Sequence, residues 1–206
     1  MEQVFQGKAE IESWLLMLAQ VFPKIEIYCT WGNHGRVGKK GENPEQVNWD
    51  YVLYKMLAES MRVQPNVKVF VSEGPHMVVR HGDFNFFLSH GDKVKSWNGI
   101  PYYGLDRMCQ KLAGLTGMIL HYVLCGHFHR HATIEIPGGM MLVNGNFVGG
   151  SYFSETVMFE TSVPSQLMYL FHDEEGIHSK SHLVLDKVPE LKADKNGIYT
   201  SYSDAA

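Results

Sequence analysis

Hydrophobic and polar positions along the chain change period, from helical spacing near the N-terminus to mainly strand spacing later. Apolar side chains recur first at the spacing i, i+3, i+4, i+7, which predicts an amphipathic helix over residues 8–22 that Pro23 ends. Residues 24–30 then alternate with period two and predict a strand, and residues 47–62 predict a second helix. The glycine-rich stretch 31–46 between them predicts a loop. The residues that carry the first helical pattern are Ile11, Trp14, Leu15, Leu18, Val21 and Phe22.

Most of the remaining chain is rich in β-branched and aromatic residues in short runs. A third helix is expected over residues 103–113, and the sequence 173–176 is expected to form a turn. Helices followed by many strands predict a mixed α/β domain whose sheets pack face to face. The expected strands are 67–71, 76–80, 84–89, 119–125, 133–136, 140–143, 156–160, 165–171 and 181–185.

Length, charge and cysteine content limit the class of protein. The chain has 206 residues, enough for one domain with a real core, and its formal net charge of −4 argues against nucleic-acid binding through bulk positive charge. Cys29, Cys109 and Cys125 are odd in number and have no CxxC spacing, so reduced intracellular thiols are expected. The N-terminus is acidic and no run approaches about 18 apolar residues, so we expect a cytoplasmic protein with no membrane partner.

Histidines and aspartates are distributed unevenly. The eleven histidines begin at His34, whereas the first aspartate is Asp50. Three histidine-containing strings stand directly after predicted strands: GNHGR at 32–36, SHGD at 89–92 and GHFH at 126–129. Strand ends are where α/β folds expose reactive side chains, so these strings are candidates for a shared site.

The GHFH string offers two nitrogen ligands. His127 and His129 are two residues apart, which in an extended segment puts both imidazoles on the same side, aimed at one metal centre or at two adjacent ones. Gly126 lets the backbone turn sharply and leaves room for an ion. Asn33 adds an amide oxygen that can bind a hard cation. A solvated histidine pair is the alternative.

The GNHGR string offers groups that recognise an anion. His34 can donate a proton or a hydrogen bond, and Arg36, with Lys39 and Lys40 nearby, can hold an anionic oxygen. Taken alone, GNH and HGD each fit an ordinary turn as well as a site. The three strings together, each after a strand, are much harder to explain as turns.

The order GNH, HG, GHxH resembles the motif series of the calcineurin-like metallophosphoesterase superfamily. Residues 146–149 (NFVG) resemble the turn that follows the family's last histidine motif, and the similarity runs over about residues 24–150. The resemblance implies a two-sheet αββα sandwich that holds two divalent metal ions at its strand ends and hydrolyses phosphoesters. It is similar in particular to DNA repair exonucleases.

Carried over by position, the resemblance implies roles for five residues. One metal would be held by Asn33, His90 and His127, and the other by His129. His34 would contact the phosphate and assist the leaving group, while a metal-bound hydroxide attacks phosphorus in line. Mn²⁺ is the expected metal, with Fe or Zn²⁺ as alternatives. Together with the cations of the loop, this gives His34 and Arg36 as the expected catalytic residues and His34, Arg36 and Lys39 as the expected substrate contacts.

The sequence also departs from the family. Gly35 and Arg36 follow GNH, where the family has Asp or Glu. The family's DxH and GDxxD motifs, which supply the bridging carboxylate, should precede GNH, but the only acids there are Glu2, Glu10, Glu12 and Glu26. We therefore expect residues 1–190 to form one metallophosphoesterase domain that lacks its first βαβ unit, followed by a polar tail over 191–206.

Three hypotheses follow from the resemblance and the departures. The first is a metal-dependent phosphoesterase that acts on a phosphodiester, with DNA or RNA as candidates. The second is a non-catalytic scaffold or binding protein that keeps the fold. The third is a split or internally started gene product, which would be inactive or aggregate alone and would need a partner chain carrying the missing motifs.

Other notable side chains have structural alternatives. His131 is either a contact behind the metal ligands or an exposed strand residue. The three histidines of the sequence 172–182 suggest a zinc clip, against which a solvated hairpin is the competing interpretation. Trp97, Tyr102 and Tyr103 can stack on a base or cap a loop.

Overall fold

The computed structural model describes residues 2–94, 102–148 and 163–185, and this part of the chain contains three helices and nine strands. Nearly every predicted element within these ranges is present. The first helix begins at Glu2 instead of residue 8 and ends at Leu18, before Pro23. The last strand begins at Gly176, so it is longer than expected and takes in the end of the predicted turn. The predicted strand 156–160 and the polar tail 191–206 lie outside the described residues. The elements are α1 (Glu2–Leu18), β1 (Ile25–Cys29), α2 (Trp49–Met61), β2 (Val67–Val71), β3 (His76–His81), β4 (Phe84–Ser89), α3 (Tyr102–Thr116), β5 (Tyr122–Cys125), β6 (Ala132–Ile136), β7 (Gly139–Val143), β8 (Ser165–His172) and β9 (Gly176–Val184).

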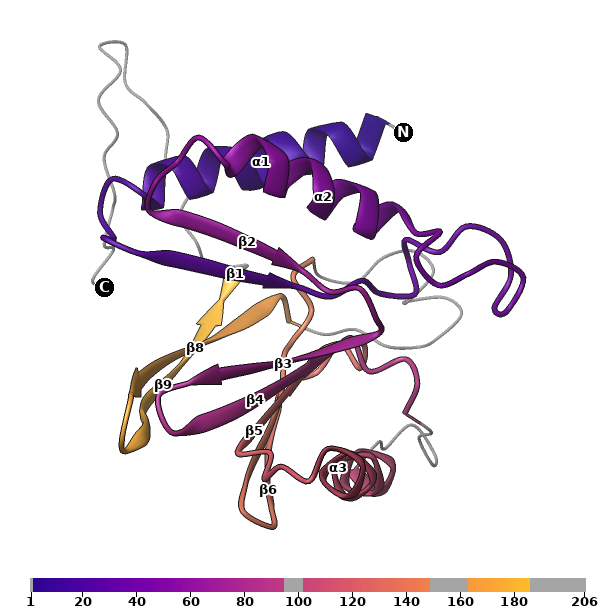
Figure 1. The fold of residues 1–206 in the computed structure, drawn as a ribbon, viewed down its shortest axis with the longest axis vertical. Coiled ribbons are helices and arrows are strands. Elements are labelled where there is room, and N and C mark those ends of the chain that lie inside the picture. Colours follow the sequence, from indigo (N-terminus) through magenta and orange to yellow (C-terminus); the bar gives the residue numbers. More distant parts are fainter. Residues whose placement is uncertain (1, 95–101, 149–162, 186–206) are drawn as a thin grey trace.

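One layer of the protein is made by α1 and α2 packed on a small parallel sheet (Figure 1). Strands β1 and β2 pair in parallel from Ile25↔Val67 to Cys29↔Val71. Apolar side chains of both helices pack against this sheet, because the helical period gives each helix one continuous apolar face. The buried residues of this cluster are Leu15, Leu57, Met61 and Val67.

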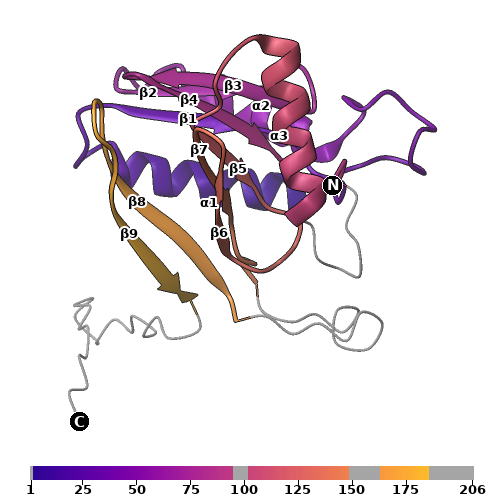
Figure 2. The ribbon, with the colours of Figure 1, turned by 90° about the horizontal axis from the view of Figure 1, so that it is seen from below.

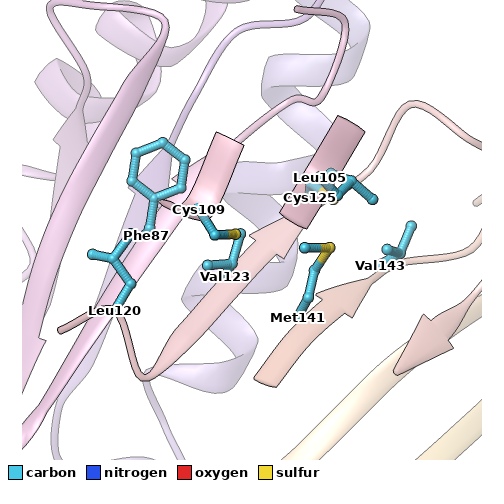
Figure 3. Close-up of a cluster of buried hydrophobic side chains, with 8 residues drawn as sticks. All are labelled: Phe87, Leu105, Cys109, Leu120, Val123, Cys125, Met141 and Val143. Atoms are coloured by element: carbon cyan, nitrogen blue, oxygen red, sulfur yellow. The ribbon is translucent and has the colours of Figure 1, made fainter. Parts of the chain in front are cut away.

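The second sheet has five strands in the order β3-β4-β5-β7-β6. Its three central strands, β4, β5 and β7, run parallel, and the antiparallel strands β3 and β6 form its edges. Helix α3 covers one face, where Leu105 and Cys109 meet the sheet (Figure 3). The sheet residues of this core are Phe87, Val123, Cys125, Met141 and Val143, and Leu120 completes it.

The β8–β9 hairpin lies against the opposite face of the same sheet. Because side chains alternate along a strand, Phe86 and Tyr122 point away from α3, and both rings contact Phe171 of β8. The Tyr122 hydroxyl also accepts a hydrogen bond of 3.2 Å from the backbone N–H of Ile177. These contacts attach the hairpin to the sheet.

Figures 1 and 2 show helices on the two outer sides of the molecule, with the sheets between them. The predicted fold class, a mixed α/β protein of the two-sheet αββα type, is therefore confirmed. In the part of the chain that the structure describes, no helix combines the length and the apolar composition needed to span a membrane.

The first prediction concerns the core under α3. Leu105 is fully buried, whereas Leu115 on the same helix is 83% exposed. Leu105→Ala should lower the free energy of unfolding by about 2–5 kcal/mol, since it removes apolar contacts and leaves a cavity. Leu115→Ala is the matched control and should change it by less than about 0.5 kcal/mol. Urea denaturation of both variants measures the difference, and equal effects would contradict the packing described for α3.

The second prediction concerns the cysteines, all of which are free and buried. Burial raises the pKa of the Cys125 thiol to about 12 and that of Cys29 to about 11. A higher pKa means less of the reactive thiolate at pH 8. Native protein should thus react slowly with a thiol reagent such as DTNB, while protein in guanidinium chloride should show three reactive thiols at once. Rapid titration of the native thiols would contradict the burial.

Candidate functional site

The carboxyl ends of β1, β4 and β5 carry the three histidine strings into one region. Ser89 at the end of β4 pairs with Cys125 at the end of β5, and the pairing continues beyond them because Gly126 N–H donates to the carbonyl of His90 at 3.1 Å. Gly91 has a positive φ of 106°, and a Cβ there would lie 3.3 Å from the Gly126 carbonyl oxygen. Only glycine fits this close approach easily, so the two loops are held side by side.

Asn33, His90 and His127 form the centre of the site, and we call them the Asn33–His90–His127 cluster. The side-chain oxygen Oδ1 of Asn33 lies 2.7 Å from His90 Nε2 and 3.2 Å from His127 Nδ1. The centres of the two imidazole rings are 5.1 Å apart. Three side chains that are remote in sequence thus turn one oxygen and two nitrogen atoms toward one another. Atoms that bind the same first-row metal ion each lie about 2.1 Å from it, so the distances between these ligand atoms are similar to the N···O distances of this cluster.

His34 and His129 lie beside this cluster as a second pair. Their ring centres are 6.5 Å apart, and His34 is exposed. The prediction that His127 and His129 share one side of an extended segment is wrong. Both residues have positive φ angles, 69° and 56°, in the left-handed region that histidine adopts more readily than most residues. As a result His127 meets Asn33 and His90, whereas His129 meets His34.

Burial and neighbouring charges set the protonation of the cluster. Burial lowers the pKa of His90 and the nearby His127 lowers it further, while the carboxylates of Asp92 and Asp50 act in the opposite direction. Burial likewise lowers the pKa of His127, against the influence of Asp92. Both imidazoles are therefore neutral at neutral pH. A neutral imidazole has the free electron pair that a metal ligand needs.

Carboxylates stand near the cluster but already have partners. Asp50 Oδ2 accepts a hydrogen bond of 2.9 Å from Gly32 N–H, and Asp92 Oδ2 forms an ion pair of 3.2 Å with Arg36 Nη2. Among residues 2–94, 102–148 and 163–185, no three His, Cys, Asp or Glu side chains gather as a metal-binding group. Neither aspartate was predicted to belong to the site, because the carboxylates expected from the resemblance precede residue 33. The sequence HGD, in which Asp92 follows His90 by two positions, was the available signal.

The start of α2 holds the GNHGR turn in place through Asn48 and Asp50, which we call the Asn48–Asp50 clamp. Asn48 Nδ2 donates to the Gly32 carbonyl at 2.8 Å, and Trp49 N–H donates to the Gly35 carbonyl at 2.7 Å. Asn48 Oδ1 also caps α2 by accepting from Asp50 N–H at 2.8 Å. The same residues therefore begin the helix and fix the turn that carries Asn33.

Gly35 is required by this clamp. A Cβ at position 35 would lie 2.2 Å from Asn48 Oδ1 and 2.6 Å from Asp50 Oδ1. Neither distance leaves room for a side chain. The carboxylate of Asp50 occupies the space beside Gly35.

The cationic residues of the loop take different positions. Arg36 lies close to the cluster through its ion pair with Asp92. Lys39 is exposed, and its backbone N–H donates to Glu42 at 2.7 Å. Lys40 lines a pocket of about 200 Å³ together with Arg36, whereas Lys39 is not among the residues that line it. Of the two lysines, Lys40 lines this pocket and Lys39 does not.

The other singled-out residues lie apart from the cluster. The turn at 146–149 packs against α1, where Phe147 and Trp14 have ring centres 6.1 Å apart, and Gly149 lies outside the described residues. The His131 ring contacts the His182 ring at a tilt of 41°, with ring centres 4.0 Å apart, and His172 Nδ1 accepts backbone hydrogen bonds within its own turn. The histidines of 172–182 therefore form no zinc clip. Trp97 lies outside the described residues.

Comparison with known proteins finds likeness in fold alone. Neither a model of a protein family nor a curated protein sequence matches the chain. A single-residue variant of Vps29 from Entamoeba histolytica is 17% identical with a TM-score of 0.45, over 83% of this chain and 88% of that one. Wild-type Vps29 of the same organism, solved with Zn²⁺, is 16% identical with a TM-score of 0.43, over 77% and 97%. A predicted phosphoesterase from Streptococcus pneumoniae is 9% identical with a TM-score of 0.39, over 85% and 90%. These likenesses concern the course of the chain; what the site can do follows from its own side chains.

The third prediction tests the clamp. Gly35→Ala should lower the free energy of unfolding by about 1–3 kcal/mol, because the new methyl group meets Asn48 and Asp50. Gly114→Ala is the control, since a Cβ at this position in α3 meets nothing within 4 Å. Replacing a helix glycine should instead stabilise the protein by about 0.5–1 kcal/mol. Urea denaturation of both variants measures the two effects, and a neutral Gly35→Ala would contradict the clamp geometry.

Proposed function

We propose that the protein binds a divalent metal ion through the Asn33–His90–His127 cluster and uses it to hydrolyse a phosphoester. The observation that carries the proposal is the convergence of Asn33 Oδ1, His90 Nε2 and His127 Nδ1, with contacts of 2.7 and 3.2 Å, from three separate loops. Three turns with no shared role would not be expected to bring these three atoms within hydrogen-bonding distance of one another.

The donor set fits a borderline metal ion. Two neutral imidazoles and one amide oxygen suit Mn²⁺, Fe²⁺ or Zn²⁺, and the nearby carboxylates of Asp92 and Asp50 help to balance its positive charge. When bound, such an ion supplies Lewis acidity, which polarises a phosphoryl oxygen and lowers the pKa of bound water. The resemblance to the family implies a second ion beside His129. The Asn33–His90–His127 cluster supplies ligands for one ion.

The remaining roles belong to side chains around the cluster. His34 is exposed beside His129, so its imidazole can reach the substrate and hold a proton for the leaving oxygen. Arg36 is oriented by Asp92 and can bind an anionic phosphate oxygen with its remaining N–H groups. A phosphodiester is the proposed substrate, and DNA or RNA ends are candidates. A cytoplasmic location stays a prediction from the reduced cysteines.

A non-catalytic scaffold is the second candidate, and one observation favours it. The polar groups of the site already satisfy one another, because Asn33 contacts both histidines, Asp50 binds the Gly32 backbone and Asp92 binds Arg36. In the described part of the chain, no carboxylate completes the cluster as a ligand group. A site closed in this way can be stable without any metal.

The fourth prediction separates the two candidates. Protein incubated with Mn²⁺ or Zn²⁺ and then desalted should retain about one ion per chain and hydrolyse bis-p-nitrophenyl phosphate. His90→Ala and His127→Ala should each lose the retained metal and at least about 100-fold in rate, because each removes a ligand. His178→Ala, on the exposed side of β9, is the control and should change neither quantity.

Elemental analysis and the hydrolysis rate are read on the same samples. If wild-type protein retains no metal and cleaves no phosphoester, the proposed hydrolase function is rejected and the non-catalytic scaffold is the candidate that stands. Retained metal without hydrolysis would keep the metal site and reject the reaction.

A further inference from the structure

A pocket of about 200 Å³ opens directly beside the Asn33–His90–His127 cluster. One wall is the loop that follows β1, including Gly32, Arg36 and Lys40, and another is formed by Asp92 and Lys93. Gly32 is also next to the cluster, since a Cβ there would lie 2.9 Å from the His90 ring. A group bound in this pocket would therefore adjoin a group bound at the cluster.

The charges that line the pocket are not balanced. Arg36 pairs with Asp92, and Lys93 pairs with Glu45. Lys40 lines the same pocket and, in the described part of the chain, forms no ion pair. The lining thus holds three cationic side chains, Arg36, Lys40 and Lys93, against the carboxylates of Glu45 and Asp92. The pocket therefore has one uncompensated cation close to the proposed reaction centre.

The aromatic side chain of the pocket is not placed to bind a base. Trp31 lines the pocket but is only 6% exposed, and its ring packs in an edge contact on Tyr51, with centres 5.4 Å apart. Stacking on a nucleobase needs an open aromatic face. The polar and cationic lining instead fits a small anion.

We propose that this pocket binds a second phosphate group of the substrate, next to the one that reacts, and that Lys40 is the residue that selects for it. This inference rests on the proposed function and deepens it by naming a substrate class: phosphoesters with a neighbouring phosphate. An oligonucleotide end supplies that phosphate one nucleoside away, and a nucleoside diphosphate supplies it directly. A charge-assisted contact of this kind supports a difference of about tenfold in affinity.

The kinetic test compares substrates with one and two phosphates on the metal-loaded protein. The substrates are the dinucleotide TpT, its end-phosphorylated forms pTpT and TpTp, and ADP. Wild-type protein should show a KM about tenfold lower for pTpT or TpTp than for TpT, or should hydrolyse the ester bond of ADP to give adenosine and pyrophosphate. The preferred substrate identifies the source of the phosphate. Lys40→Ala should raise the KM for the preferred substrate about tenfold and leave that for TpT unchanged.

Two variants control this comparison. Lys111→Ala removes the same charge from an exposed residue of α3, which lies outside the pocket lining, and should behave as wild type. Lys40→Arg should retain the preference, because it keeps the charge. A Lys40→Ala variant with an unchanged KM for every substrate would overturn the inference while leaving the proposed function intact.

A binding measurement separates failure of the inference from failure of the proposed function. Inorganic phosphate is titrated by calorimetry into metal-free protein, which needs no catalysis. Binding that is lost in Lys40→Ala and kept in Lys111→Ala supports the pocket even if no substrate is hydrolysed. Equal binding by both variants, or no binding by wild-type protein, overturns it.

Discussion

The hydrogen bonds of the Asn48–Asp50 clamp are the constraint on which the site depends. Asn48 is only 4% exposed, and its amide bonds the Gly32 carbonyl on one side and caps α2 on the other. A buried amide needs these partners, since an unpaired one costs about 1–3 kcal/mol. Formation of α2 and fixation of the turn at 32–36 are therefore one event. Asn33 reaches His90 and His127 only from a turn held in this way.

The electrostatics of the site combine two opposing influences. Burial lowers the pKa of His90 and of His127, while Asp92 acts in the opposite direction on both and Asp50 on His90 alone. Neutral imidazoles with the carboxylate of Asp92 nearby favour a cation at the cluster. Arg36 and Lys40 line the pocket beside the cluster, where their charges favour an anion. A cation with an anion beside it is the charge arrangement of a metal-bound phosphate.

Periodicity predicted the fold well because it encodes which side chains face a neighbouring layer. The strand and helix patterns of residues 24–143 gave elements whose ends differ from the structure by a few residues, and the three histidine strings indicated the right edge of the sheets. Spacing contains no information on contacts across 57 or 94 residues, such as those of Asn33 with His90 and His127. It also could not show that Asp50, far along the chain, occupies the space beside Gly35, or that Lys40 and not Lys39 turns into the pocket.

The left-handed conformations of His127 and His129 have a consequence for how this sequence can change. Each non-glycine residue in this region costs folding free energy, on the order of 1 kcal/mol. Glycine would remove that cost at both positions, so selection for stability alone would drive the imidazoles out. Under the proposed function, the two histidines therefore mark a place where folding stability is lowered to keep metal ligands in position. In a screen of random variants for resistance to heat, substitutions that gain stability and lose function should be enriched at these two positions.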